Sequence, residues 1–126
     1  KGPTRVVATH FMTGKPGDVR DEQAEALVDV VEDDEEAVIL GDFNVVPDRD
    51  EPAYRVLDDA FADVWDVADE TVGGPGTWSA SNPRRRIDYV FLKGDWRVHE
   101  AEVSGNPRAS DHLAVSAEIE PTGGDG

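Results

Sequence analysis

Apolar and polar positions change their spacing several times along the chain. A short apolar run within Arg5 to Phe11 predicts a first strand, and Ala37 to Leu40 is a second run in which every residue is apolar. A Gly-Pro loop, Gly14 to Gly17, follows the first strand. An amphipathic helix is then predicted from Asp18 to about Asp33, because four apolar residues recur there at helical spacing: Ala24, Leu27, Val28 and Val31.

A second helix is predicted after Asp50-Glu51-Pro52, with Asp50 as its cap and the proline in its first turn. Its buried face consists of Tyr54, Leu57 and Phe61. The next stretch, Phe61 to Val67, reads FADVWDV and fits both a helical turn and an extended segment.

The rest of the chain is strand-like. After a glycine-rich loop, Thr77-Trp78 begins a short strand, and three longer strands are predicted: Ile87 to Leu92, Trp96 to Val103 and Leu113 to Ile119. Strand, helix, strand, helix and then several strands predict an α/β fold with a mixed sheet. We expect one domain over residues 1–120 and a frayed tail from Pro121 to Gly126.

Composition narrows the chemistry. The 126 residues include 28 acids against 12 Lys and Arg, a formal net charge of -16, and no cysteine. Any metal must therefore be held by oxygen or histidine ligands, and a carboxylate-rich site favours Mg²⁺ or Mn²⁺. The acidity is typical of proteins from salt-loving archaea, and molar salt shortens the Debye length to roughly 3 Å. Net charge therefore does not exclude a phosphate-bearing substrate. No apolar run is long enough for a membrane span and no signal-peptide pattern is visible, so we expect a soluble, cytoplasmic protein.

Polar side chains interrupt or follow the apolar strands at four places. A charge in a central strand costs several kcal/mol unless it is paired, hydrogen-bonded or bound to metal. In layered α/β folds, side chains at sheet ends converge on one crevice. We therefore expect one shared site formed by His10, Asp42, Asn44, Asp88, Asp111 and His112.

Each of these residues also has a purely structural interpretation. Asp42 and Asn44 suit turn chemistry, and Asp88 has three nearby arginines, Arg84 to Arg86, with which to form an ion pair. Ser110-Asp111 fits the start of a strand, and an isolated histidine such as His10 is more often structural than catalytic. Structural roles alone explain poorly why four such features occur in one small domain.

Four short motifs, in this order, resemble the endonuclease/exonuclease/phosphatase (deoxyribonuclease I-like) superfamily. They are THF at 9–11, GDFN at 41–44, RIDYVF at 86–91 and SDH at 110–112. Arg20-x-x-Gln23-Ala24 and Gly76-Thr77-Trp78 are similar as well. The resemblance implies a layered α/β sandwich, of which this chain looks like the C-terminal half of a haloarchaeal-type metal-dependent hydrolase.

The resemblance also implies residue roles. Asp42 would orient or deprotonate the attacking water, and Asn44 would bind that water or the scissile phosphate. Asp88 would orient the imidazole of His112, which exchanges a proton or hydrogen bond with the phosphoryl group. Asp111 resembles a metal ligand, as does Asp42, and His10 would contact a phosphate oxygen. Trp78 suits either stacking on a base or sugar, or packing in the core.

Two functions follow. The first is a metal-dependent phosphoester hydrolase of the phosphodiesterase, endonuclease or phosphatase type, acting on nucleic acid, a phosphoinositide or another phosphodiester. The alternative is a non-catalytic α/β association module. The resemblance implies that one sheet face is normally covered by an N-terminal half, so we expect this chain to form a homodimer through that face, which carries Val6, Val38, Leu40, Val90 and Leu92.

Overall fold

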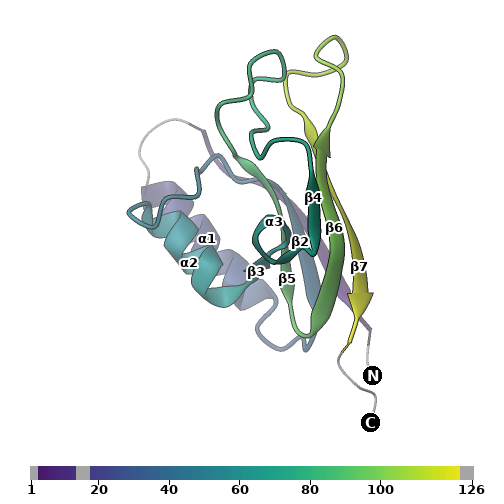
Figure 1. The fold of residues 1–126 in the computed structure, drawn as a ribbon. Coiled ribbons are helices and arrows are strands. Elements are labelled where there is room, and N and C mark those ends of the chain that lie inside the picture. The colour runs from purple at the N-terminus through teal and green to yellow at the C-terminus, as the bar shows by residue number, and fades with distance from the viewer. Residues whose placement is uncertain (1–2, 14–17, 123–126) are drawn as a thin grey trace.

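The computed structural model describes residues 3–13 and 18–122 and shows two sheets with the two longer helices on one side (Figure 1). The predicted loop Gly14 to Gly17 and residues 123–126 of the predicted tail lie outside the described residues. In chain order the elements are β1 (Arg5–His10), α1 (Asp18–Val30), β2 (Ala37–Asp42), α2 (Pro52–Ala60), β3 (Ala62–Asp63), α3 (Val64–Val67), β4 (Glu70–Val72), β5 (Asp88–Lys93), β6 (Trp96–Ser104) and β7 (Ala114–Pro121).

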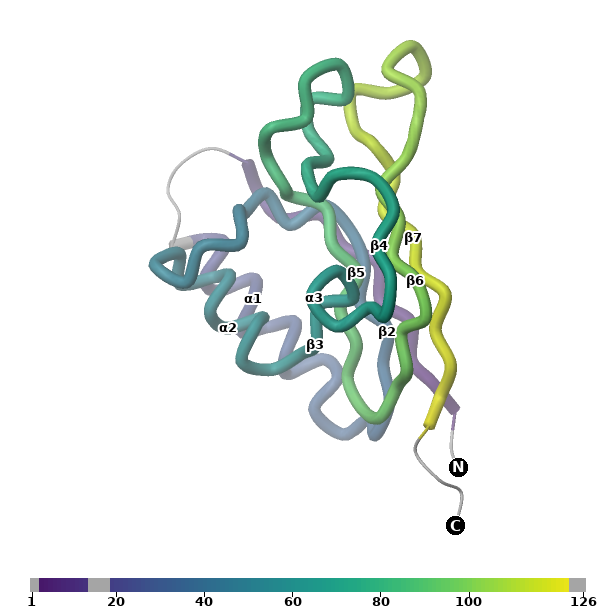
Figure 2. The backbone as a smooth tube through the Cα atoms, viewed as in Figure 1, coloured from purple at the N-terminus to yellow at the C-terminus, as the bar shows by residue number. Residues whose placement is uncertain are grey.

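The first sheet has the strand order β1-β2-β5-β3. β1 and β2 run parallel, as expected for two strands joined through a helix, and β5 is antiparallel to β2 and β3. The tube in Figure 2 shows α1 and α2 lying together on one side of this sheet. The predicted α/β class with a mixed sheet is therefore confirmed.

An aromatic core fills the space between this sheet and the helices. Side chains alternate between the two faces of a strand, so Ile39 in β2 and Tyr89 and Phe91 in β5 point toward the helices and are buried. Phe43 lies at the centre, with ring centroids 5.3 Å from Phe91 and 4.9 Å from Phe11. The helices contribute the buried residues Ala24, Leu27, Val31, Ala53, Tyr54 and Leu57.

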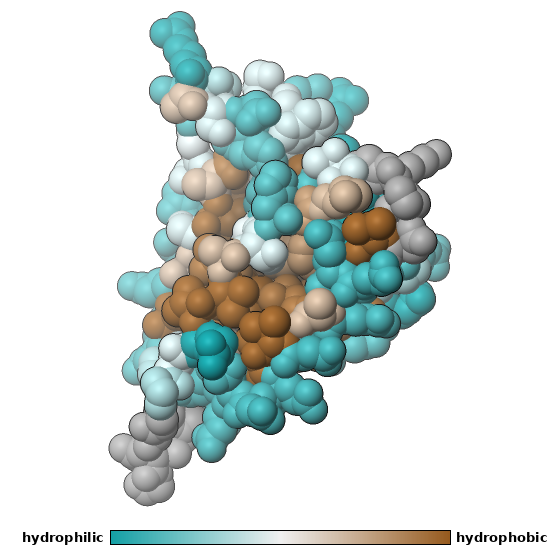
Figure 3. All heavy atoms as spheres, turned by 180° about the vertical axis from the view of Figure 1, so that it is seen from behind, coloured by the Kyte–Doolittle hydropathy of each residue, from teal (hydrophilic) through white to brown (hydrophobic). Residues whose placement is uncertain are grey.

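The second sheet has the order β4-β6-β7 and lies beside the first. Its core is a smaller cluster in which Val98 and Ala101 of β6 pack with Val64 of α3 and Leu92 of β5. Leu92 points away from the α1/α2 core, so β6 covers one end of the first sheet's second face. The rest of that second face is only partly covered: Val6 is 66% exposed, and Val38, Leu40 and Val90 are half-buried. Figure 3 shows the resulting apolar patch from behind.

Several details were left open by the sequence or differ from its prediction. Within Phe61 to Val67, the extended β3 comes first and the helix α3 follows directly. The change occurs at Asp63, whose carboxylate accepts the Trp65 N–H and caps α3. Asp50 does not cap α2, whose N-cap is Glu51 without a side-chain bond. The Asp50 N–H instead donates to the Asp48 carboxylate. β4 was not predicted, and Thr77-Trp78 forms only isolated bridges.

Other predictions agree with the structure to within a few residues. Tyr54, Leu57 and Phe61 are buried as expected. The frayed tail was predicted to begin too early, because Pro121 is the last residue of β7 and the Thr122 N–H donates to the Asp95 carbonyl. Across the described part of the chain, no helix combines the length and the apolarity that a membrane crossing needs.

Candidate functional site

Three strand ends place their polar residues side by side. In the register of the first sheet, His10 of β1 lies opposite Asp42 of β2, and Asp42 lies opposite Asp88 of β5. Paired residues of neighbouring strands share one face, so the three side chains form a row. Ile39 of β2 and Tyr89 of β5 belong to the helix-facing core. Asp42 is three residues from Ile39 and Asp88 is one residue from Tyr89, so both aspartates point to the opposite face, away from α1 and α2.

The backbone around Asp42 needs its particular neighbours. Gly41 has φ +150°, and a Cβ there would lie 1.8 Å from the Thr9 carbonyl oxygen, so only glycine lets β1 and β2 approach so closely. Asn44 has φ +50°, a conformation that asparagine tolerates better than most residues. The Asn44 N–H donates to Asp42 Oδ1 at 3.0 Å, and its side-chain Nδ2 donates to the Phe11 carbonyl at 2.7 Å. The GDFN motif therefore ends β2 with a side-chain-to-backbone bond from Asn44 to Asp42, and it contributes both residues to the site.

A chain of contacts links Asp88, His112 and Asp42. Asp88 Oδ2 lies 2.7 Å from His112 Nδ1, and His112 Nε2 lies 3.6 Å from Asp42 Oδ2. The buried hydroxyl of Thr77 accepts the N–H groups of Ile87 and Asp88, which fixes the start of β5. The alternative pairing of Asp88 with Arg84, Arg85 or Arg86 is wrong. Asp88 pairs with His112, and Arg86 pairs instead with the buried carboxylate of Asp63.

The environment of His112 favours its protonated form. Partial burial lowers the pKa of the imidazolium, but the hydrogen bond to Asp88 and the charges of Asp88, Asp42 and Asp111 outweigh burial. The net result is a pKa above the ordinary value for histidine. His112 is therefore a better hydrogen-bond donor to an anion at neutral pH than a free histidine.

The two other charged residues predicted for the site, His10 and Asp111, differ in how close they lie to Asp42, Asp88 and His112. His10 is exposed, with Nε2 3.5 Å from Asp42 Oδ2. Asp111 is also exposed, and its carbonyl accepts the Ala80 N–H. Within residues 3–13 and 18–122, one group of side chains could hold a metal ion: Asp42, Asp88 and His112, whose ligand atoms lie within 4.8 Å of one another. Asp111 is not in this group, and its role as a ligand stays a prediction.

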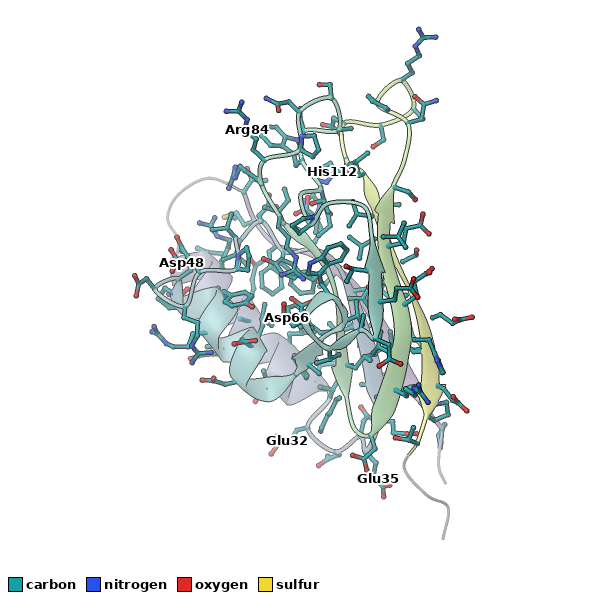
Figure 4. All side chains as sticks on the ribbon, in the orientation of Figure 1. Glu32, Glu35, Asp48, Asp66, Arg84 and His112 are labelled. Carbon is teal, nitrogen blue, oxygen red and sulfur yellow. The ribbon has the colours of Figure 1, made fainter. Side chains whose placement is uncertain are left out.

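A cleft of about 610 Å³ opens over the site. In Figure 4, His112 lies at one end of the sheets, and Glu32 and Glu35 lie at the other end. Neither Arg20 nor Arg85 was predicted as a site residue, yet both line this cleft together with His10, Thr13, Asp42, Asn44, Trp78, Ile87 and His112. The available signal was the run of three arginines before β5 in a strongly acidic chain.

Comparison with known proteins agrees with this geometry. A model of the Endonuclease/Exonuclease/phosphatase family matches residues 3–112, so the chain belongs to that family. Its members are hydrolases that act on phosphoester bonds and are generally dependent on a divalent metal ion. No curated protein matches the chain.

Solved structures share the fold. An endonuclease/exonuclease/phosphatase from Bacteroides vulgatus has a TM-score of 0.78 and 25% identity, covering 90% of this chain and 49% of its own. An endonuclease/exonuclease/phosphatase from Beutenbergia cavernae has a TM-score of 0.73 and 29% identity, and the match covers 92% of this chain and 36% of that protein. The Bacteroides thetaiotaomicron mannosyl-6-phosphatase Bt3783 has a TM-score of 0.63 and 22% identity, covering 87% and 51%. The chain thus spans about half the length, or less, of these relatives.

Proposed function

We propose that Asp42, Asp88 and His112 form the hydrolytic centre of a divalent-metal-dependent phosphoesterase. The observation that carries this proposal is the contact chain from Asp88 through His112 to Asp42, formed where three segments far apart in sequence meet. Membership of a family of phosphoester hydrolases supports the same chemistry. Asp42 and His112 also line an open cleft, which a purely structural salt bridge would not require.

The donor atoms fit a hard divalent cation. Two carboxylates lie together on the open face of the first sheet, and oxygen ligands of this kind suit Mg²⁺ or Mn²⁺. Asp42 and Asp88 would hold the ion. His112 would not be a ligand, because Asp88 holds its Nδ1 and its Nε2 stays available for the substrate. The ion would neutralise charge on the phosphoryl oxygens. Asp111 would add a further carboxylate from the loop before β7.

The side chains then divide the remaining work. Asp42 accepts a proton from a water molecule, whose oxygen forms the new bond to phosphorus. The ester bond on the opposite side of phosphorus breaks, and the leaving oxygen takes a proton from solvent. His112, held by Asp88 and favoured as the imidazolium, donates to a nonbridging oxygen. Asn44 and His10 border the cleft and are positioned to bind phosphate oxygens.

Hydrolysis of bis-p-nitrophenyl phosphate with Mg²⁺ or Mn²⁺ at molar KCl tests this proposal. Asp88→Asn should lower kcat on the order of a hundredfold, since it removes the charge that orients His112. His99→Gln is the control, because the His99 imidazole pairs with Glu120 on the second sheet and does not line the cleft. Equal activity of the two variants would refute the assignment, as would a chain without turnover under any of these conditions.

The open face of the first sheet supports a second proposal, that this chain associates with a copy of itself. A groove of about 460 Å³ runs between the two sheets, lined by apolar residues including Val38, Leu40, Val90 and Ile119. Covering several hundred Å² of apolar surface is worth several kcal/mol at roughly 25 cal/mol per Å². The same groove reaches Asp42 and Asp88, so a covering copy would also close the hydrolytic site on that side.

Light scattering at molar KCl tests this association, because high salt screens the repulsion between two chains of net charge -16. If the chain forms a two-fold dimer, the measured mass should be twice the monomer mass. Val38→Asp should abolish the dimer and return the mass to that of the monomer. A mass near 13.7 kDa at all concentrations would refute the dimer. An associating chain without hydrolysis would favour the non-catalytic function instead.

A further inference from the structure

A second cleft is lined by residues that have no role in the proposed hydrolysis. Its volume of about 680 Å³ falls within the range of about 300–1,000 Å³ that is usual for small-ligand sites. Its walls come from the turn after β2, from α3, and from the loops at 74–76 and 83–86. Most of the lining is apolar, including Val46, Pro47, Trp65, Pro75, Pro83 and Leu113. A cleft of this kind is suited to the apolar part of a ligand.

Two arginines interrupt this apolar lining. Residues 84–86 alternate, so that Arg84 and Arg86 line the second cleft while Arg85 lines the hydrolytic cleft. Arg84 is exposed and forms no ion pair or hydrogen bond within the described part of the chain. Arg86 bonds to Asp63 through Nη2 alone, and the N–H groups of its Nη1 and Nε have no partner among the described residues. The cleft therefore offers arginine donors to an anionic group.

The charges around the second cleft match a ligand with one negative charge. The Asp63 carboxylate already neutralises Arg86, so Arg84 supplies the uncompensated positive charge of the described lining. The lining also contains Asp66, which is exposed on α3. Figure 4 shows Asp66 in the middle of the molecule, whereas Arg84 lies at the end that carries His112. A carboxylate fits this arrangement, because the planar fork of a guanidinium pairs with it through two parallel bonds.

Three segments form the wall between the second cleft and the hydrolytic cleft. In the segments 76–78, 84–87 and 112–113, adjacent or alternate residues line opposite clefts. The second cleft is lined by Gly76, Arg84, Arg86 and Leu113, and the hydrolytic cleft by Trp78, Arg85, Ile87 and His112. The two clefts therefore share one wall.

Thr77 joins the three segments of this wall. Its N–H donates to the Arg85 carbonyl and its carbonyl accepts the Leu113 N–H, both at 2.8 Å. Its buried hydroxyl accepts the Asp88 N–H at 3.3 Å. Because Leu113 directly follows His112, a ligand that displaces the wall from the second cleft would also displace the pair formed by Asp88 and His112.

We propose that the second cleft binds a small apolar carboxylate, and that its occupancy changes the environment of His112. The apolar group would lie against Val46, Trp65 and the prolines, and the carboxylate would accept hydrogen bonds from Arg84 and Arg86. This inference goes beyond the proposed hydrolysis and does not depend on it, because ligand binding and the His112 environment can both be measured without turnover.

Calorimetric titration with 2-naphthoate and with 2-naphthalenemethanol tests the binding, since the two probes share the aromatic rings and differ in the carboxylate. We expect the wild-type chain at neutral pH and molar KCl to bind the naphthoate on the order of tenfold more tightly. Arg84→Gln should remove this difference. Arg85→Gln is the matched control and should preserve it, because Arg85 lines the other cleft. Equal affinities of the wild-type chain for the two probes, or no binding of either, would overturn the inference.

A second pair of variants locates the apolar part of the probe. Val46→Ser should weaken the binding of both probes alike, whereas Val38→Ser, in the groove on the open face of the first sheet, should weaken neither. Loss of binding in Arg85→Gln or Val38→Ser, with binding intact in Arg84→Gln and Val46→Ser, would place the probe elsewhere and overturn the assignment. Near-ultraviolet circular dichroism establishes that each variant keeps its packing.

Nuclear magnetic resonance of the imidazole rings tests the effect across the shared wall. Saturating 2-naphthoate should shift the His112 signals and leave those of His99, which pairs with Glu120 on the second sheet, in place. Arg84→Gln should abolish the His112 shift at the same naphthoate concentration. A chain that shows both binding and this shift would uphold the inference even without phosphoester turnover. Unchanged His112 signals in a chain that binds naphthoate would overturn the proposed effect on the hydrolytic site.

Discussion

The buried ion pair between Asp63 and Arg86 gives the sharpest stability prediction. Arg86 Nη2 donates to both carboxylate oxygens of Asp63 at 2.6 Å, and the side chains of Arg86 and Asp63 are only 11% and 1% exposed. Asp63 also caps α3, and the Arg86 guanidinium lies 4.8 Å from the centroid of the Tyr89 ring. The pair therefore links α3 to the start of β5, two residues before Asp88.

Removing one partner leaves the other charge buried. Asp63→Asn keeps the size and the cap but removes the countercharge of Arg86, and breaking a buried pair in this way costs about 3–5 kcal/mol. Asp63→Ala should cost about 1 kcal/mol more, because the cap is lost as well. Such losses approach the whole stability of a small domain, about 5–15 kcal/mol. Replacing both partners, as in Asp63→Leu with Arg86→Met, should cost less than Asp63→Asn alone.

Urea unfolding at molar KCl, followed by tryptophan fluorescence, measures these differences. The matched control is Asp69→Asn, which breaks the exposed pair between Asp69 and Arg97, where Asp69 is 51% exposed. Exposed pairs contribute about 0–1 kcal/mol. If Asp63→Asn and Asp69→Asn shift the free energy of unfolding equally, burial does not set the cost and the reasoning is refuted.

Three further predictions concern Gly41 in β2, the histidine His112 and the surface charge. Gly41→Ala should destabilise the fold on the order of 3 kcal/mol because its Cβ would meet the Thr9 carbonyl, whereas Gly74→Ala meets nothing within 4 Å; equal urea midpoints would contradict this. The raised pKa of His112 means that its imidazolium stabilises the fold below the unfolded pKa, and that this contribution disappears as pH rises through the folded pKa. In EDTA, the difference in unfolding free energy between the wild type and His112→Gln should therefore shrink as pH rises from about 6 to 8.5, and a widening difference would show the opposite sign. With net charge -16, the melting temperature should rise from dilute to molar KCl, and a flat curve would argue against strong self-repulsion.

Much of the fold could be predicted because local patterns carry it. The spacing of Ala24, Leu27 and Val31 reflects burial against the first sheet, and the wholly apolar run before Asp42 reflects a central strand. The predicted site residues come together because His10 and Asp42 are the last residues of β1 and β2, and Asp88 is the first residue of the antiparallel strand β5. Their motifs mark strand ends, which is information that the sequence contains.

Pairing between distant segments could not be predicted from such patterns. Asp63 and Arg86 are 23 residues apart, and nothing local distinguishes Arg86 from Arg84 or Arg85 as the buried partner. The answer depends on the alternation of residues 84–86 between two clefts, which depends on the bridge to Trp78. β3 and β4 have two and three residues, too few for a periodic pattern to show.

The most direct test of the hydrolytic centre is a double-variant cycle on Asp42 and His112 with bis-p-nitrophenyl phosphate and Mn²⁺ at molar KCl. Both groups act on one phosphoryl centre, so removing either should abolish most of the rate enhancement. We predict that Asp42→Ala and His112→Ala each lower kcat on the order of a thousandfold, and that the double variant is no worse than the more damaged single variant. Losses that multiply in the double variant, or near-normal turnover in either folded single variant, would contradict a shared catalytic site.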